Sequence, residues 1–430
     1  MESVSTIGSN RHPESCFNLI DFCPDYRRRP TAWFLTPKYQ TLSDLFEKIN
    51  SWLSSHPEWI AVSCESIIYD PDSGFGNGKS VSVGCLSRKG IKGIRLWLTP
   101  NKGNQPFQKL GCVNIVPKLN GNNIITNGSN GRNSWTPNGH ETMEEMVNRV
   151  NNTLSKKPIE GKIISIETVP ISVTGKWEID TESSEYNRDS SSYAQTLRIY
   201  YEYGEPCKEE IGLKDFIPTS SPWDSPMAPL DYESFASLFT RASQWFRDQP
   251  KHYRYLNCQS VEVPLTPKVN SESKQQIDSN LSLIIPGKAE FSLKFIRLAY
   301  AVPTKGIPVD SVSHQEIVLN CKIFVPIRLK STNQYESVAA TKRKMEAWLT
   351  ITGAKVLSAE TTFLKLSYSN SSIAANVDSC LTLLTNRPND SHHIVTYRVY
   401  LDGHYVEPPT RLLPSFENES PTEESTCSIS

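Results

Sequence analysis

The sequence predicts an α+β protein built from four tandem, diverged repeats of about 100 residues each. Three observations lead to this prediction. A similar segment recurs four times, each copy begins with helix-like apolar periodicity, and each copy continues with two strand-like runs. The copies start at Thr41, Thr142, Ser234 and Ser337. Starts that lie about one domain length apart indicate a repeated folding unit rather than a short solenoid repeat.

Each copy opens with Ser or Thr, whose hydroxyl can accept a hydrogen bond from a free amide of the first helical turn. An apolar face at helical spacing follows. In the first copy this face consists of Leu42, Leu45, Phe46, Ile49, Trp52 and Leu53. We expect the face, including Trp52, to be buried core. The fourth copy has Thr341 and Lys342 where the others are mostly apolar, so we expect its helix to be less deeply buried.

Proline and glycine mark where each helix should end, because proline cannot continue the hydrogen-bond ladder. Pro57, Pro158 and Pro250 stand at one offset in the first three copies, and Gly353 takes their place in the fourth. A strand is predicted after each helix, over residues 60–67, 162–169, 253–261 and 355–362. A second strand follows, over residues 94–97, 197–200, 296–300 and 397–400. After the first three of these comes a third strand-like run ending in proline, at 113–117, 213–218 and 323–326.

Each repeat is therefore predicted to contain a helix, two strands and a third strand, with the helix packed on a small antiparallel sheet. An N-terminal arm precedes the repeats, and its segment 17–22 has the pattern of an edge strand. An Asn/Gly-rich linker separates the first two repeats. The predicted organisation is an arm at 1–30, repeat 1 at 31–119, a linker at 120–133, repeat 2 at 134–220, repeat 3 at 221–330, repeat 4 at 331–410, and a disordered acidic tail at 411–430.

Three repeats carry a glutamate on the first strand and an arginine on the second. The pairs are Glu65 with Arg95, Glu167 with Arg198, and Glu360 with Arg398. One hypothesis is a carboxylate and a guanidinium that converge on a ligand. The other is a structural pair of neighbours on adjacent strands, which contributes roughly 0.2–1 kcal/mol. We favour the structural hypothesis, because repeat 3 has Gln259 in place of the glutamate. In either case the members of each pair should lie close together.

Composition and charge exclude several classes of function. The formal net charge of −1 provides no overall positive field for nucleic acid. No catalytic, cofactor-binding or metal-binding constellation appears among the recognisable motifs, so none of these sites is assigned. The N-terminal residues do not resemble a secretory signal. The scattered cysteines are accordingly expected to be reduced thiols in a cytoplasmic protein.

The last four residues, Cys427-Ser428-Ile429-Ser430, fit the pattern of a prenylation signal. A terminal serine after an aliphatic residue is the type associated with farnesyl transfer to the cysteine. Cys427 is therefore a candidate lipidation site. A single lipid chain gives only marginal binding, so we expect at most a peripheral contact with the cytoplasmic face of a membrane.

The leading hypothesis is a non-enzymatic repeat protein that acts as an intracellular scaffold or adaptor for an unidentified protein partner, because linked modules multiply binding surface. An enzyme with a site in a groove between repeats is the alternative, and would show a deep pocket with convergent ionisable groups. A ligand- or carbohydrate-binding module is a third possibility, and would show exposed aromatic side chains at one place in every repeat.

Overall fold

A computed structural model of the chain contains four α-helices and a set of small antiparallel sheets within the residues that it describes. The described residues are 17–28, 38–69, 81–83, 89–103, 106–119, 126–127, 133–134, 139–173, 178–187, 190, 192–206, 208–220, 232–265, 277–285, 289, 291–304, 316–329, 335–366, 368–369, 372–373, 379–385 and 392–414. The arm before residue 17, most of the predicted linker and the tail from residue 415, with Cys427, lie outside them.

The helices begin where the sequence predicts. They are α1 (Leu42–Ser55), α2 (Met143–Leu154), α3 (Phe235–Arg247) and α4 (Val338–Thr352), with a short 3₁₀ turn at Thr410–Leu412. The side chains of Thr41, Thr142, Ser234 and Ser337 each accept a hydrogen bond from the amide three residues later. This satisfies one of the amides that a helix start leaves free. At the end of α4, Gly353 adopts the left-handed conformation with φ of 62°, which glycine adopts without strain.

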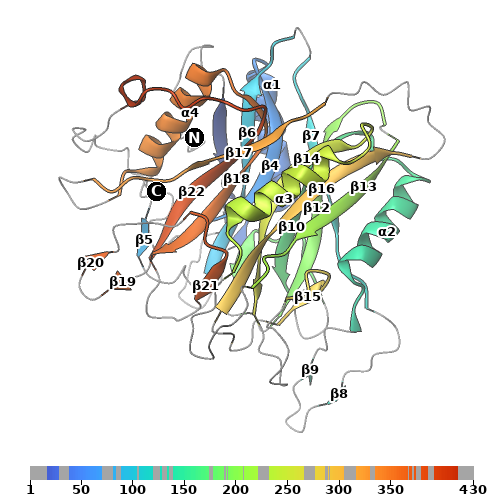
Figure 1. Cartoon of the computed structure of the whole chain (residues 1–430). Helices are drawn as coiled ribbons and strands as arrows, with labels where there is room; N and C mark the ends of the chain where they lie inside the picture. Colours follow the sequence, from blue (N-terminus) through green and yellow to red (C-terminus); the bar gives the residue numbers. More distant parts are fainter. Residues whose placement is uncertain are drawn as a thin grey trace.

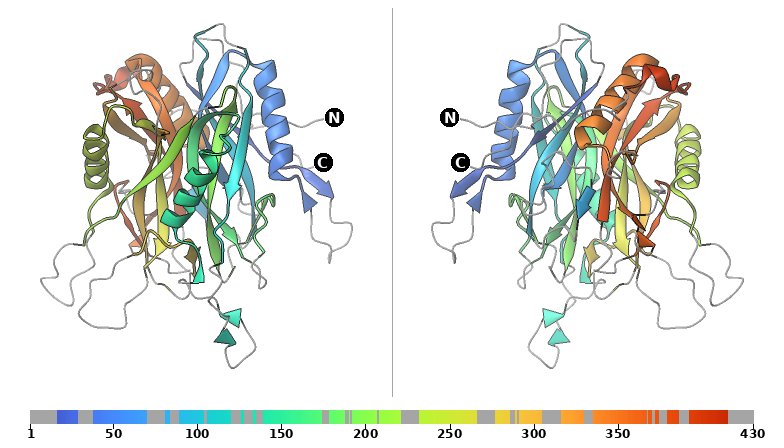
Figure 2. Two further views of the ribbon diagram at one scale, coloured as in Figure 1. Left: turned by 90° about the vertical axis from the view of Figure 1, so that its right-hand side faces the viewer. Right: turned by 90° about the vertical axis from the view of Figure 1, so that its left-hand side faces the viewer.

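Four four-stranded antiparallel sheets form a ring like the blades of a small propeller, with the helices on the outside (Figures 1 and 2). Sheet 1 contains β1 (Asn18–Phe22), β4 (Trp59–Tyr69), β6 (Lys89–Pro100) and β11 (Glu185–Asn187). Sheet 2 contains β7 (Leu110–Ile115), β10 (Gly161–Ser172), β12 (Tyr193–Tyr203) and β15 (Leu283–Ile284). Sheet 3 contains β13 (Glu209–Phe216), β14 (Arg254–Pro264), β16 (Phe291–Pro303) and β21 (Leu383–Thr385). Sheet 4 contains β17 (Leu319–Phe324), β18 (Lys355–Leu366), β22 (His392–Asp402) and β5 (Val81–Val83).

Three two-stranded ribbons complete the described strands. They pair β2 (Tyr26–Arg28) with β3 (Lys38–Tyr39), β8 (Thr126–Asn127) with β9 (Asn133–Ser134), and β19 (Tyr368–Ser369) with β20 (Ser372–Ile373).

Each third strand belongs to the sheet of the following repeat. β7 follows the long strands of repeat 1 but pairs with β12 of repeat 2; β13 pairs with β16 and β17 pairs with β22 in the same way. Sheet 1 has no preceding repeat, and the N-terminal strand β1 fills the same position beside β6. The predicted edge strand at 17–22 is therefore the piece that completes the ring.

The segment between the two long strands of a repeat also contributes a short strand, which pairs with the sheet of the preceding repeat. β11 of repeat 2 pairs with β6 of repeat 1, β15 of repeat 3 with β12, and β21 of repeat 4 with β16. β5 of repeat 1 pairs with β22 of repeat 4 and closes this second cycle. Each sheet therefore combines the two long strands of one repeat with one strand from the segment before it and one strand from the next repeat around the ring. None of the four sheets is formed by a single repeat.

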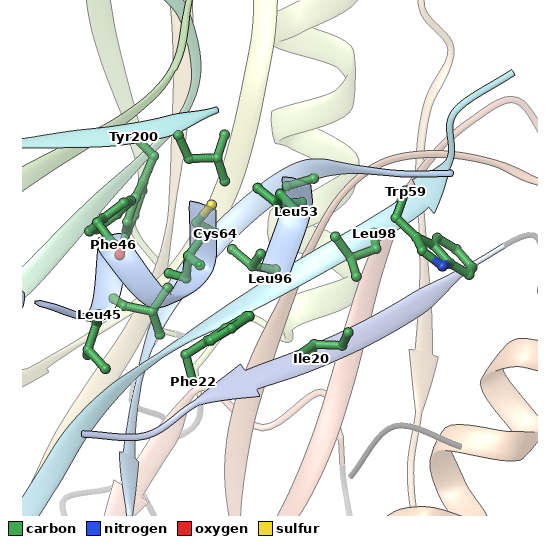
Figure 3. Packing of buried hydrophobic residues seen from close by; sticks show 14 of the residues in the cluster. Ile20, Phe22, Leu45, Phe46, Leu53, Trp59, Cys64, Leu96, Leu98 and Tyr200 are labelled. Carbon is green, nitrogen blue, oxygen red and sulfur yellow. The ribbon is translucent and has the colours of Figure 1, made fainter. Parts of the chain in front are cut away.

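Each helix packs over the junction between two sheets. Leu45 and Phe46 of α1 share a hydrophobic cluster with Leu96 of sheet 1 and with Leu110 and Tyr200 of sheet 2 (Figure 3). Similar clusters place α2 between sheets 2 and 3, α3 between sheets 3 and 4, and α4 between sheets 4 and 1. The helix of one repeat therefore buries its apolar face against residues of two repeats, which the sequence alone did not predict.

Two expectations about helix burial are wrong. In α4, Thr341 is 1% exposed and its hydroxyl donates to Glu336, while the amine of Lys342 donates to the carbonyl of Leu19 in β1. These polar side chains are buried because the ring-closing strand and the start of the helix supply their partners. In α1, Trp52 is only partly buried and packs edge-on against Phe22.

Replacing Trp52 by alanine should therefore cost less than the loss of a fully buried aromatic side chain. We expect the free energy of unfolding of the full chain to fall by roughly 1–3 kcal/mol, below the 3–5 kcal/mol typical of a fully buried site. Chemical denaturation measures the change. Ser51→Ala on the exposed neighbouring position is the control and should be nearly neutral; a Trp52→Ala variant as stable as that control would place Trp52 outside the packed face.

Candidate functional site: the junctions between repeats

The recurring first-strand glutamate makes its closest contacts with the preceding repeat. Glu167 of β10 accepts hydrogen bonds from the amide of Ser66 in β4, at 2.9 and 3.0 Å, and from the Ser66 hydroxyl at 2.8 Å. Glu360 of β18 accepts from the amide and hydroxyl of Ser260 in β14, at 2.6 and 2.7 Å. The Glu-Ser signature of the sequence therefore joins neighbouring inner strands, with the Glu from one repeat and the Ser from the repeat before it.

The junction between repeats 2 and 3 shows that the carboxylate itself is not required. Gln259 accepts from the amide of Thr168 at 2.8 Å, and its own amide group donates to the Thr168 carbonyl at 3.0 Å. A glutamine thus satisfies both backbone groups of an otherwise unpaired strand edge. This favours a structural role for the position in all four repeats.

The same contact closes the ring. Glu65 of β4 accepts from the amide of Thr361 in β18 at 2.8 Å and also from the Thr361 hydroxyl, although 296 residues separate the two. The first repeat therefore binds the fourth as the second binds the first. Contacts between β4, β10, β14 and β18 continue around the whole cycle.

The second-strand arginines complete each junction. Arg95, Arg198 and Arg398 lie directly opposite Glu65, Glu167 and Glu360 in strand register. Each also donates to the Ser or Thr hydroxyl of the preceding repeat; for Arg198 and Ser66 the distance is 2.7 Å. Arg95 donates to Thr361, Arg297 to Thr168, and Arg398 to Ser260. At each junction, the Ser or Thr hydroxyl of one repeat therefore accepts a hydrogen bond from the arginine of the next repeat. The same hydroxyl donates to, or lies beside, the Glu or Gln that pairs with that arginine.

A second polar position in the junctions was missed by the sequence analysis. Ser165 accepts from the amide of Cys64 at 3.2 Å, and Ser63 accepts from the amide of Ala359 at the same distance. Asn257 exchanges two hydrogen bonds with the backbone of Ile166. The signal was present, because a small polar residue precedes the Glu or Gln by two positions in every repeat. The strand register shifts just before this position in all four long-strand pairs, as at a β-bulge.

The number of carboxylates around the arginine differs between junctions. A residue of the third-strand position also faces each arginine: Asp21, Asn114, Asp215 and Ile323 in order around the ring. Arg297 is bound by Asp215 alone, since Gln259 is neutral, and Arg398 lies 3.7 Å from Glu360. Arg95 has two carboxylates, with both Asp21 oxygens at 2.6 Å and Glu65 at 3.9 Å. Among the described residues, the arginine at the seam between repeats 4 and 1 therefore has one more carboxylate beside it than the arginines of the other junctions.

Burial raises the pKa of Glu65 to about 8, although Arg95 and the Thr361 hydrogen bonds act in the opposite direction. Asp21 lies closer to Arg95 than Glu65 does, so its charge offsets much of the stabilisation that Arg95 would give to ionised Glu65. Asp21 also keeps the pKa of Arg95 high despite burial. Lys342 and Glu346 of α4, 3.7 Å apart, add no net charge at this seam. Burial also raises the pKa of Glu167, where Asn114 is neutral.

The stability of the protein should therefore depend on pH through Glu65. Its pKa is higher in the folded state than the ordinary value near 4.5, so folding is favoured by protonation and this stability is lost as pH rises through about 8. We expect the free energy of unfolding to decline between about pH 5 and 8. Glu65→Gln, which copies Gln259 of repeat 3, should flatten that decline. A pH profile unchanged by Glu65→Gln would contradict the assignment.

The polar side chains of the junctions form hydrogen bonds between neighbouring inner strands. Glu360 and the recurring arginines are buried, Glu65 and Glu167 are partly buried, and all of them are bound within the ring. Burial also raises the pKa of Cys64 and Cys258 well above the usual thiol value, so both are neutral thiols rather than nucleophiles. In the described ranges, no group of three His, Cys, Asp or Glu side chains is placed to hold a metal ion.

Comparison with known proteins gives no further guide. No protein-family model matches the chain, and neither a curated protein nor a solved structure shows significant similarity to it. None of the helices in the described segments is both long and apolar enough to cross a membrane.

Proposed function

We propose that the chain is a non-enzymatic intracellular repeat protein that acts as a scaffold or adaptor for a protein partner. The observation that supports this is the use made of the recurring polar residues. The recurring Glu, Ser/Thr and Arg residues would be the natural candidates for a repeated active site. Their side chains instead form the hydrogen bonds that join the repeats to one another. The outward faces of the helices also differ between the repeats, and they are not used in joining the repeats.

The outward faces of the helices are the surfaces that this proposal assigns to partners. Each helix packs on its sheets with one face, and its other face is exposed. On α2 the exposed face carries Asn148 and Asn152, which line a shallow hollow of about 460 Å³ together with Lys156 and Lys157 just after the end of the helix. The corresponding part of α1 carries Glu47 and Ser51 instead. A closed ring holds such unlike surfaces at fixed spacing, and linked sites raise the effective concentration of bound partners.

A membrane tether through Cys427 is a separable part of the proposal. The tetrapeptide Cys427–Ser430 is a farnesylation signal only where Ser430 ends the chain. Intact mass of the C-terminal peptide from eukaryotic cells, with Cys427→Ser as control, decides this part. A peptide that ends in unmodified Cys-Ser-Ile-Ser would remove the lipid and the membrane from the proposal while leaving the scaffold.

The scaffold itself is tested by proximity cross-linking and mass spectrometry of the full chain in cells. Lys156→Glu with Lys157→Glu reverses charge at the hollow just after α2, and Glu47→Lys with Ser51→Lys changes charge on the outward face of α1. Both variants should melt as the wild type does. We expect each to lose a different subset of the cross-linked proteins. Identical sets from wild type and both variants would contradict the proposal that these helix faces bind partners.

A further inference from the structure

A lysine buried at the junction between repeats 1 and 2 forms no ion pair with any of the described residues. Lys92 occupies the strand position three residues before Arg95, and Gln195 and Lys294 occupy that position in repeats 2 and 3. The equivalence is structural as well, because the three backbone amides donate in the same way to Ser184, Ser282 and Thr382 of the following repeat. The side chains of the two lysines can therefore be compared directly.

Lys294 has both a hydrogen-bond acceptor and a nearby carboxylate. Its amine donates to the carbonyl of Phe363 and lies 4.0 Å from the carboxylate of Glu262. The neighbouring Arg398 has Glu360 opposite it. Two cations thus face two carboxylates at the junction between repeats 3 and 4.

Lys92 lacks both kinds of partner. It is 7% exposed, and none of the described residues accepts a hydrogen bond from its amine or forms an ion pair with it. The neighbouring Arg198 is 2% exposed and directs N–H groups at Asn114 and Ser66. Among the described residues, Glu167 is the carboxylate that acts most on Arg198; it is partly buried and already accepts from Ser66 and Tyr200. The described part of this junction therefore sets two buried cations, Lys92 and Arg198, against this one partly buried carboxylate.

Two more distant carboxylates partly offset the excess positive charge at this junction. Asp180 and Glu185, both exposed, favour the charged form of Lys92. Burial and the repulsion of Arg198 nevertheless lower the pKa of Lys92 to about 8. The amine still carries its proton at pH 7, so a buried positive charge remains to be compensated.

A small cavity lies where that charge is located. It is lined by Leu42, Leu45, Lys92, Gly93, Ile94, Ser183, Ser184 and Arg198, and its volume is about 10 Å³. That is room for one particle of the size of a water molecule, or for a halide ion of similar size. The amides at the start of α1 do not contribute, because Leu42 and Ser43 donate to the backbone and side chain of Glu182.

We propose that this cavity binds one small monovalent anion, a halide, between the amine of Lys92 and the guanidinium of Arg198. The anion restores one negative charge for each buried cation, as Glu262 does beside Lys294. It also gives the Lys92 amine an acceptor, and it occupies a junction formed by residues of repeats 1 and 2. Halide binding therefore stabilises the contact between these two repeats.

The test measures the thermal midpoint of the full chain at pH 6.5 in sodium bromide and in sodium gluconate of equal ionic strength. Because a ligand that binds only the folded state raises the midpoint by mass action, we expect a saturable rise in bromide and none in gluconate. Lys92→Gln copies residue 195 and should abolish the difference. Lys294→Gln is the matched control, and should keep the bromide effect whatever it does to stability.

Crystals of the wild type grown or soaked in bromide give a readout that does not depend on any variant. We expect an anomalous peak between Lys92 and Arg198. Equal midpoints in the two salts, a bromide effect that survives Lys92→Gln, or an ordered water alone at the site would each overturn the proposal.

Discussion

Replacing Arg297 by methionine is expected to lower the free energy of unfolding by roughly 3–5 kcal/mol, because breaking a buried ion pair leaves its partner charged and uncompensated. Arg297 is 3% exposed and holds both oxygens of Asp215, at 2.8 and 2.7 Å. It also donates to the Thr168 hydroxyl of the preceding repeat at 2.9 Å. Its loss should therefore weaken one sheet and one junction together.

A second substitution separates these two contributions. Sheet 4 has Ile323 opposite Arg398, where sheet 3 has Asp215 opposite Arg297. In the Arg297→Met, Asp215→Leu double variant no buried carboxylate is left unpaired, and most of the lost stability should return. Arg254→Met is the control, since its bidentate pair with Glu209 is more exposed and should cost about 1 kcal/mol or less. Equilibrium denaturation of the full chain measures all three, and equal losses for Arg297→Met and Arg254→Met would contradict the account.

Truncating Phe22 in β1 is expected to cost as much as truncating the same position inside the ring. Phe22 pairs with Ile94 and Phe216 pairs with Ile296, so the two are equivalent in strand register. They are 6% and 5% exposed. Replacement by alanine should lower the free energy of unfolding by roughly 3–5 kcal/mol at each site. β1 precedes the first repeat, whereas β13 lies within the repeats, yet the two phenylalanines are buried to a similar extent.

The comparison of the two phenylalanine variants is informative because β1 lies outside the four repeats and β13 lies within them. Similar losses, measured by denaturation of the full chain, would show that the N-terminal strand is a structural member of sheet 1. A Phe22→Ala variant that is nearly as stable as the wild type, beside a strongly destabilised Phe216→Ala, would mean that β1 does not complete the ring.

The sequence predicts local structure in this chain well and the pairing between repeats poorly. Caps such as Thr41 and stop signals such as Gly353 act within a few residues, so the helix boundaries follow from them. Which strand pairs with which is decided by tertiary packing, and the pattern of a strand such as β7 is the same whether it joins its own sheet or the next. One clue was visible, because only three repeats have a third strand while a strand-like segment precedes the first repeat.

In the candidate site, too, contacts within a repeat can be predicted from the sequence and contacts between repeats cannot. The register of Glu65 with Arg95 is a contact between sequence-adjacent strands, and periodicity is sufficient to predict it. The contact of Glu65 with Thr361 spans 296 residues, and no local signal predicts that the acceptor lies in another repeat. The buried position of Lys342 is of this kind too, since its partner is in β1.

Hydrogen exchange at the backbone amide of Thr361 tests the central claim, the closed ring, most directly. This amide donates to Glu65 of the first repeat, so it is protected only if repeats 4 and 1 meet. We predict slow exchange in the wild type, and faster exchange at Thr361 in Glu65→Ala, with the Ser260 amide, bound by Glu360, unchanged. Exchange of the Thr361 amide at the rate of an exposed strand edge in the wild type would mean that the ring is open.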